Sequence, residues 1–349
     1  MGAPDVKVEK WFKGKSAAIA ITLDDWTPGQ AMLGADVLMQ MELPATIYVT
    51  LHNMQMRPSY AHWERLQQLK DLGYEIGNHT MTHPDLTQAS TQQCIYEVNE
   101  AKKILDSHLQ GIPVETFAYP HGRFNDAAVE QVMRGHIGGR AFSPGMPKGI
   151  GKWPEHLNYY ADKFFYDFAN SEKDYFSVSQ FRVNDDVTPE HIKRLMQRVM
   201  TKNGLVPMVF HGFYDEENVL DKEMYDAMHL QTFIALLASI KSLDEKVWIT
   251  TFANAVKYHR AVAASSINLK WHQDYEDGGS RYEFLLRSVD PYTSIKLHPL
   301  TLTAEITDGR RCNFVSQGSK ELDFRVVGNC VQFEVEPFES IVALRFETI

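Results

Sequence analysis

Two neighbouring carboxylates, Asp24 and Asp25, end an apolar stretch at residues 17–23. An unpaired charge at the end of a buried strand is costly and is normally compensated by a cation or a charged partner. Neighbouring side chains on a regular strand point to opposite faces, so both carboxylates can reach one site only where the chain bends. Trp26-Thr27-Pro28-Gly29 supplies such a bend. The alternative is an aspartate that caps the next helix while its neighbour faces solvent.

Two histidines, His79 and His83, follow a second β-like stretch at residues 74–78. A spacing of four brings both imidazoles to one side of a turn and suits two nitrogen ligands on one metal ion. Pro84 disfavours α conformation at His83, so the pair is expected in a turn and not inside a helix. Thr80 stands where a zinc peptidase of the H-E-x-x-H type has its base, which disfavours that mechanism.

Two further strand ends carry candidate groups. His211 follows the apolar run 205–210, and at the end of a strand a general acid is favoured over a buried core histidine. The segment Tyr119-Pro120-His121-Gly122 follows another β-like run and could point a backbone N–H at an oxyanion. A simple turn between strand and helix is the alternative for this segment.

The elements that must position these groups alternate from residue 17 to about 262. The expected strands are 17–23, 45–50, 74–77, 116–119, 205–210 and 247–251. Helical patterns lie near 30–41, 59–72, 91–109, 126–134, 189–201 and 225–242, and Ser90 with Gln93 predicts a capping box at the start of the third. About seven βα units predict a closed or nearly closed parallel barrel of the α/β class. The aromatic segment 144–183 reads as a long excursion with one or two strands of its own.

In such a barrel the carboxyl ends of all strands lie on one face, where active sites are built. Asp25, His79 and His83 are therefore expected to bind one divalent metal ion, with coordination positions left open for water and substrate. The second carboxylate is then free to act as a base. Two nitrogens and one oxygen favour zinc, with cobalt, nickel and iron as the alternatives.

After residues 263–266 the pattern changes to short strand-like runs without helices. These runs are 281–288, 294–297, 301–306, 321–327, 330–335 and 341–346, and they predict a β-sandwich. The expected domains are a barrel over 1–265 and an accessory β-sandwich over 266–349. Trp271, Tyr275 and Tyr282 are expected to pack against the barrel, with sugar binding as the alternative. The three cysteines, Cys94, Cys312 and Cys330, make a disulfide scaffold implausible, and pairing of the last two is the less favoured outcome.

Composition excludes some classes of partner. The net charge is −10 and no cluster of Lys and Arg interrupts the acidity, which disfavours nucleic acid as a partner. No apolar run reaches the 18 or so residues of a membrane span. No signal peptide is visible at the start, and we expect an exported protein, periplasmic or on the cell surface, from which the signal has been removed, with a cytoplasmic protein as the alternative. Sequence gives no oligomeric state.

Four motifs together resemble the polysaccharide deacetylase family (carbohydrate esterase family 4, with the nodulation-type chitooligosaccharide deacetylase domain, or NodB-like barrel). They are Thr22-Leu-Asp-Asp25, His79-Thr-x-x-His83, Phe117-Ala-Tyr-Pro-His-Gly122 and Val209-Phe-His211-Gly. The segment 247–258 also looks like the end of such a domain, so the resemblance covers about residues 17–260. It implies a distorted (β/α)7 barrel that removes acetyl groups from N- or O-acetylated sugars.

The resemblance also implies roles for single residues. Asp25, His79 and His83 would bind the metal, and Asp24 would be the base that activates metal-bound water. The backbone N–H of His121 would help to hold the oxyanion, and His211 would protonate the leaving amine or alcohol. The substrate would be an acetylated oligo- or polysaccharide, and Trp26, Tyr119 and Pro120 are expected to line its cleft.

The chain departs from the family pattern at several positions. The usual Gly after the aspartate pair is Trp26, an Arg that orients the base in many members is Ala118, and an aromatic residue is replaced by His121. The acidic partner of His211 is expected at Asp185 or Asp186. All three replacements fall where a substrate would touch.

Three other hypotheses stay open at this point. A barrel relative could hydrolyse a non-sugar C–N bond, as in a cyclic imide or ureide, and such relatives often lack a complete metal triad. Trp26 and Ala118 motivate a glycan-binding protein with a decayed site. A non-haem iron oxygenase also uses two histidines and a carboxylate, but it has no clear use for the second aspartate.

Overall fold

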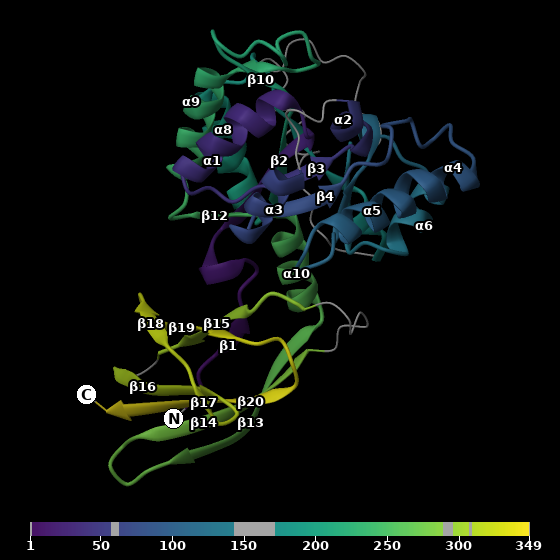
Figure 1. The fold of residues 1–349 in the computed structure, drawn as a ribbon. Coiled ribbons are helices and arrows are strands. Elements are labelled where there is room, and N and C mark those ends of the chain that lie inside the picture. Colours follow the sequence, from purple (N-terminus) through teal and green to yellow (C-terminus); the bar gives the residue numbers. More distant parts are fainter. Residues whose placement is uncertain (1, 57–62, 143–171, 289–295, 307–308, 349) are drawn as a thin grey trace. The chain divides into compact units, whose positions relative to one another are not determined.

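The computed structural model describes residues 2–56, 63–142, 172–288, 296–306 and 309–348 (Figure 1). Their contacts group the chain into two compact units. One unit is Ser16–Val256, and the other joins Met1–Lys15 to Lys257–Ile349. The N-terminal residues therefore pack with the C-terminal region, and a separable domain boundary near residue 265 stays a prediction.

The unit Ser16–Val256 is built on one parallel sheet whose strand order is β7-β6-β5-β4-β3-β2-β9-β8, with β12 also paired to β2. The strands are β2 (Ala17–Asp25), β3 (Thr46–Val49), β4 (Glu75–Asn78), β5 (Thr116–Ala118), β6 (Gly138–Ala141), β7 (Val178–Ser179), β8 (Phe181–Arg182), β9 (Leu205–Phe210) and β12 (Val247–Thr250). The two strands at the ends of this order, β7 and β8, are separated in the chain only by Gln180. The sheet therefore curls into a nearly closed barrel, and the predicted α/β barrel is confirmed.

The central strand β2 shows why these residues form the barrel. Every residue from Ala17 to Asp24 is buried, as expected for a strand that is covered on both faces. β9 pairs along one of its edges, while β12 pairs with its first half and β3 with its second half along the other. β2 therefore fixes the level at which the neighbouring strands end.

Helices accompany the strands of this unit, and the last of them continues into the second unit. They are α1 (Ala35–Gln40), α2 (Leu51–Met56), α3 (Trp63–Asp71), α4 (Thr91–Ile95), α5 (Ala101–His108), α6 (Asp126–Met133), α8 (Pro189–Thr201), α9 (Leu230–Lys241) and α10 (Phe252–Ala263). In α8 the buried residues Ile192, Leu195, Met196 and Val199 recur at helical spacing. The capping box predicted at Ser90 and Gln93 is confirmed. Between α4 and α5 the helix widens into a π-helical segment, Tyr96–Glu100.

Some elements differ from the sequence prediction. The helix expected from residue 225 begins only at Leu230, after the short strands β10 (Phe213–Tyr214) and β11 (Met228–His229). The strand β6 was not predicted, because Gly-Gly-Arg-Ala has no β-branched residue. Within the excursion at 144–183, β7 and β8 are the described strands, and Trp153, Tyr159, Tyr160, Phe164, Phe165, Tyr166 and Phe168 lie outside the described residues.

The second unit consists of two antiparallel sheets, as the β-sandwich prediction requires. One sheet has the order β13-β14-β20-β16-β17 and the other β1-β15-β19-β18. The strands are β1 (Val6–Val8), β13 (Ser265–Asp274), β14 (Ser280–Ser288), β15 (Leu300–Glu305), β16 (Arg310–Gln317), β17 (Lys320–Glu321), β18 (Phe324–Val327), β19 (Cys330–Val335) and β20 (Ser340–Thr348). The sequence prediction missed β1, which pairs with β15. The expected strand 294–297 is not formed over its described residues, 296 and 297.

Side-chain predictions for this unit have mixed outcomes. All three cysteines are free, so the less favoured pairing of Cys312 with Cys330 does not occur. Tyr282 is fully buried, and its hydroxyl accepts a hydrogen bond from Arg310 of the same unit; packing of these aromatic residues against the barrel stays a prediction. Trp271 is 43% exposed on β13. Across the described helices, none combines the length and apolarity needed to cross a membrane.

Candidate active site

The two carboxylates at the end of β2 address one site because the backbone turns sharply there. Asp25 has a φ of 82° and Trp26 a φ of 55°, both in the left-handed region that residues with a side chain rarely adopt. This turn releases Asp25 from the strand alternation, so it no longer has to face away from Asp24. The bend expected from the sequence thus begins at the second aspartate itself.

Strand register brings the other predicted residues to the same level. Asp25 lies beside Val49 of β3, and Val49 lies beside Asn78, the residue before His79. On the other edge of β2, Leu23 lies beside Phe210, the residue before His211. The strands are parallel, so their carboxyl ends gather on one face of the barrel and place these groups around a common point.

Asp25, His79 and His83 form an Asp-His-His cluster whose ligand atoms lie within 4.8 Å of one another. Asp25 Oδ1 lies 3.7 Å from His79 Nε2 and 3.6 Å from His83 Nε2. Donors bonded to one tetrahedral ion at about 2.1 Å would lie about 3.4 Å apart. The donor set and its spacing therefore fit a divalent metal ion.

The protonation of His79 also suits a ligand. Its Nδ1 lies 2.8 Å from the carbonyl oxygen of Ala118, which accepts a hydrogen bond from the ring and leaves Nε2 with a free lone pair. Burial lowers the pKa of His79 to about 3 and also lowers the pKa of His83. Burial raises the pKa of Asp25 to about 6. Both imidazoles are thus neutral at physiological pH, as metal binding requires.

Asp24 is 5% exposed and forms an ion pair with Arg140 of β6, which is 1% exposed. Burial alone would raise the pKa of Asp24, but Arg140, assisted by His79 and His211, reverses this effect and lowers it. The Arg140 guanidinium also lies over the ring of Tyr48, 4.8 Å from its centroid. Asp24 is therefore held ionised, with its Oδ2 3.7 Å from His79 Nε2.

Sequence reasoning missed Arg140. The resemblance pointed to an arginine at position 118, where this chain has Ala, and the structure supplies a cation from the neighbouring strand instead. Ala118 and Arg140 lie side by side in the register of β5 and β6. The available signal was a single charged residue among small ones, Gly138-Gly139-Arg140-Ala141, in a stretch that is wholly buried.

His211 lies at the end of β9 and is partly buried. Its Nδ1 is 3.9 Å from Asp226 Oδ2, and Asp226 in turn forms a 2.8 Å ion pair with Arg182. The expectation that Asp185 or Asp186 pairs with His211 is wrong, since the carboxylate comes from the loop between β10 and β11. Burial lowers the pKa of His211, against the opposing effect of Asp24 and Asp25.

The segment after β5 brings a further imidazole to the site. His121 has a φ of 58°, and its exposed ring lies 4.6 Å, centroid to centroid, from the ring of His83. The use of its backbone N–H for an oxyanion stays a prediction.

Trp26, Tyr119 and Pro120, which were expected to line the substrate cleft, are buried, and Trp26 belongs to the hydrophobic core. Contact of these three residues with a substrate stays a prediction.

A buried carboxylate, Asp221, fastens two of these loops together. Its Oδ2 accepts hydrogen bonds from Gly29 N at 3.0 Å, from Phe213 N at 3.1 Å and from the Thr27 hydroxyl. A Cβ on Gly29 would lie 2.0 Å from the carbonyl oxygen of Phe213, so this contact requires glycine. The loops after Asp25 and His211 are therefore held at a fixed separation.

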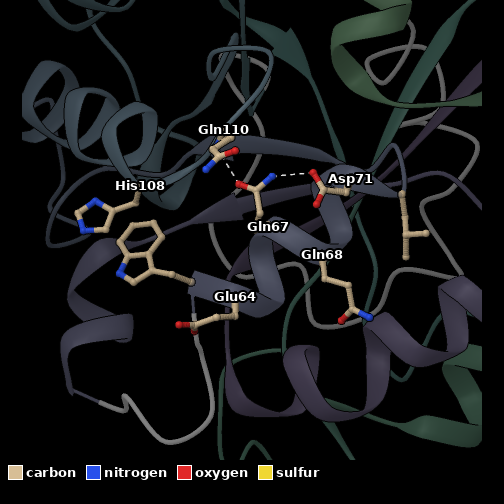
Figure 2. A pocket seen from close by; sticks show the side chains of 8 residues that line it. Glu64, Gln67, Gln68, Asp71, His108 and Gln110 are labelled. Atoms are coloured by element: carbon tan, nitrogen blue, oxygen red, sulfur yellow. Dashed lines mark hydrogen bonds between the residues drawn. The ribbon is translucent and has the colours of Figure 1, made fainter.

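A hollow of about 580 Å³ lies between α3 and the end of α5, away from the candidate active site residues (Figure 2). Trp63 stacks on His108 at 4.2 Å, and Gln67 lies at the centre of the lining. The Gln67 amide already donates to Asp71 and accepts from the backbone N–H of Gln110. The Gln67 amide is therefore already hydrogen-bonded to other residues of the protein, and we assign no catalytic or binding function to this hollow.

Comparisons with known proteins find similarity to deacetylases. Residues 13–135 match the family model "Polysaccharide deacetylase". Peptidoglycan-N-acetylglucosamine deacetylase PgdA of Listeria monocytogenes is 27% identical over 129 residues, which are 36% of this chain and 26% of the Listeria protein. The chitooligosaccharide deacetylase of Sinorhizobium fredii is 30% identical over 91 residues, 26% of this chain and 40% of that protein. The match therefore spans about a quarter of the length of the Listeria relative.

Among solved structures, the Streptococcus pyogenes deacetylase PplD in complex with acetate is 26% identical. Its match covers 36% of this chain and 56% of that chain, with a TM-score of 0.34.

Proposed function

We propose that this chain, whose residues 13–135 match the polysaccharide deacetylase family model, is a hydrolase that removes acetyl groups from N- or O-acetylated carbohydrate. The observation that carries the proposal is the Asp-His-His cluster beside an ionised Asp24, which Arg140 holds at the carboxyl face of the barrel. A ligand cluster with an adjacent base and a nearby acid is what hydrolysis of an acetyl group needs.

Asp25, His79 and His83 would hold one divalent cation, with zinc favoured over cobalt, nickel and iron. When bound, such a cation lowers the pKa of a water molecule toward neutrality and polarises the acetyl carbonyl. The protein's own contribution is to keep both imidazoles neutral and to fix the tautomer of His79 through the Ala118 carbonyl.

Asp24 would act as the general base. Arg140 binds its Oδ1, which leaves Oδ2 on the side of His79 and free to accept a proton from water. His211 would act as the general acid and return a proton to the leaving amine or alcohol. Asp226, 3.9 Å away, would favour the protonated form of that imidazole.

The backbone N–H of His121 would hold the acyl oxygen as charge develops on it. The exposed imidazole of His121 would meet the sugar at the rim of the site. Trp26, Tyr119 and Pro120 are buried, so their contribution to substrate binding would be to shape the loops. Export of the protein to the periplasm or cell surface remains a prediction, in keeping with a polymeric glycan substrate.

Acetate release tests the proposal. The purified protein, loaded with zinc, is incubated with acetylated xylan and with chitooligosaccharides, and Asp24→Asn is the control because it keeps the size of the side chain. We expect release by the wild type and a loss of at least about 100-fold in the variant. Binding of these glycans without release from any of them would instead support a glycan-binding protein. The Arg140–Asp24 ion pair argues against a decayed site, because Arg140 supplies the positive charge that the arginine expected at position 118 would have supplied.

A further inference from the structure

The loop that carries His79 and His83 has a strained backbone. Thr80 has a φ of 74° and His83 a φ of 62°. Such conformations persist only where the surroundings enforce them. Part of the enforcement is local, because Asn78 Oδ1 accepts from Thr80 N at 2.9 Å and Thr80 Oγ1 accepts from His83 N at 2.9 Å.

The middle of the loop is held from two sides. The carbonyl oxygens of Thr80 and Met81 accept hydrogen bonds from the backbone N–H groups of Leu51 and His52, at the start of α2. The N–H groups of Met81 and Thr82 point the other way, toward Glu97. Glu97 Oε2 accepts from Met81 N at 3.0 Å and from Thr82 N at 2.9 Å, and Oε1 accepts from the Thr82 hydroxyl at 2.7 Å.

Glu97 is itself unusual in its placement. Its side chain is 6% exposed, and no cation pairs with it among the described ion pairs. It lies in the π-helical segment Tyr96–Glu100, where one widened turn interrupts the helix from α4 to α5. π-Helical turns are rare, occur mostly as single turns inside α-helices and are frequently found at functional sites. Glu97 is the residue of this segment that makes three hydrogen bonds to the loop.

We propose that Glu97 is a positioning residue that sets the metal affinity of the Asp-His-His cluster, through Met81 and Thr82. It would touch neither the metal nor the substrate. Its three hydrogen bonds would fix Met81 and Thr82, which lie in the turn between His79 and His83. The Nε2 atoms of both histidines would then face Asp25. The inference rests on the proposed metal site, but not on the identity of the glycan.

Zinc affinity of the full chain, measured by competition with a chromophoric chelator, tests the proposal without a glycan. For Glu97→Ala we expect affinity to fall 10- to 100-fold, the usual cost of losing a group that orients metal ligands. Glu97→Gln keeps a carbonyl oxygen for the two N–H groups and an amide that can donate to the Thr82 hydroxyl, so it should stay within about threefold of wild type. Glu100→Ala, a half-exposed glutamate of the same π-helical segment, should bind as the wild type does.

Hydrogen exchange of the Met81 and Thr82 amides in metal-free protein gives an independent readout. Exchange should accelerate in Glu97→Ala and stay near the wild-type rate in Glu97→Gln and Glu100→Ala. If Glu97→Ala does not fold, Thr82→Val removes only the hydroxyl contact and should show a smaller loss of zinc affinity.

Several results would overturn the inference. One is a folded Glu97→Ala that binds zinc as tightly as the wild type, and another is unchanged exchange of the two amides. Equal loss in Glu97→Gln and Glu97→Ala would show that the charge matters and not the hydrogen bonds. A failure of the proposed function has a different signature, namely normal zinc binding without acetate release.

Discussion

Replacing Arg140 by methionine would leave the Asp24 carboxylate buried without its cation. Breaking a buried ion pair by removing one partner costs about 3–5 kcal/mol, because the remaining charge stays desolvated. A Coulomb estimate agrees, since two charges about 4 Å apart at an effective dielectric constant of 20 attract by about 4 kcal/mol. We therefore expect Arg140→Met to destabilise the unit Ser16–Val256 by about 3–5 kcal/mol at pH 7.

The pair with Asp24 can be isolated by a double-mutant cycle. Asp24→Asn together with Arg140→Met removes both charges, so the double variant should be more stable than Arg140→Met alone. Native-state hydrogen exchange of β2 amides reports the opening free energy of this unit separately from the β-sandwich unit. The measurement is made with a chelator present, so that no metal ion contributes charge.

The opening free energy of this unit should depend on pH in opposite directions in the wild type and in Arg140→Met. The folded-state pKa of Asp24 lies below its usual 3.8, so its ion pair stabilises the wild type above that value and the stabilisation is lost as pH falls through the folded-state pKa. In Arg140→Met, burial would dominate and raise the pKa, so acidification should stabilise the variant relative to pH 7. A variant as stable as the wild type at pH 7, or a double variant no better than the single one, would refute the role assigned to Arg140.

Three more predictions follow from the site. His83→Ala should weaken zinc binding at least about 100-fold in chelator competition while the apo protein stays folded, and unchanged affinity would rule out the Asp-His-His cluster. Asp226→Asn should leave the Arg182 cation unopposed and lower the pKa of His211, so the alkaline limb of kcat/KM for acetate release should move down by about one pH unit; a limb that stays in place would count against His211 as the acid. Asp221→Ala should cost about 3 kcal/mol in urea unfolding because three buried donors lose their acceptor, whereas a loss below about 1 kcal/mol would contradict its role in joining the loops.

The sequence predicted the parts of the site that are local in the chain. Asp24 and Asp25 end β2, His79 directly follows β4 and His83 lies four residues further along the same loop, and parallel strands must end on one face. The barrel was predictable for the same reason, since short apolar runs alternated with amphipathic helices.

The supporting residues could not be predicted because they come from distant segments. Arg140 reaches Asp24 from a strand of small residues that has no β pattern, and Asp226 belongs to a loop between two-residue strands. Glu97 lies on a helix whose periodicity gives no sign of a π-helical turn. The pairing of β1 with β15 likewise joins segments almost 300 residues apart, a contact that local pattern does not encode.

The order of pairing around β2 bears on how this protein is made. β2 is the first barrel strand to leave the ribosome, but the strands along one edge and half of the other, β9 and β12, are among the last. Until β9 and β12 are synthesised, the edges of β2 lack these hydrogen-bonding partners. Unpaired edges of an apolar strand favour aggregation. Assembly is therefore governed by long-range contacts and is expected to be slow. Ending the chain before residue 247 would remove the partner of the first half of β2, so truncated forms should accumulate as insoluble protein.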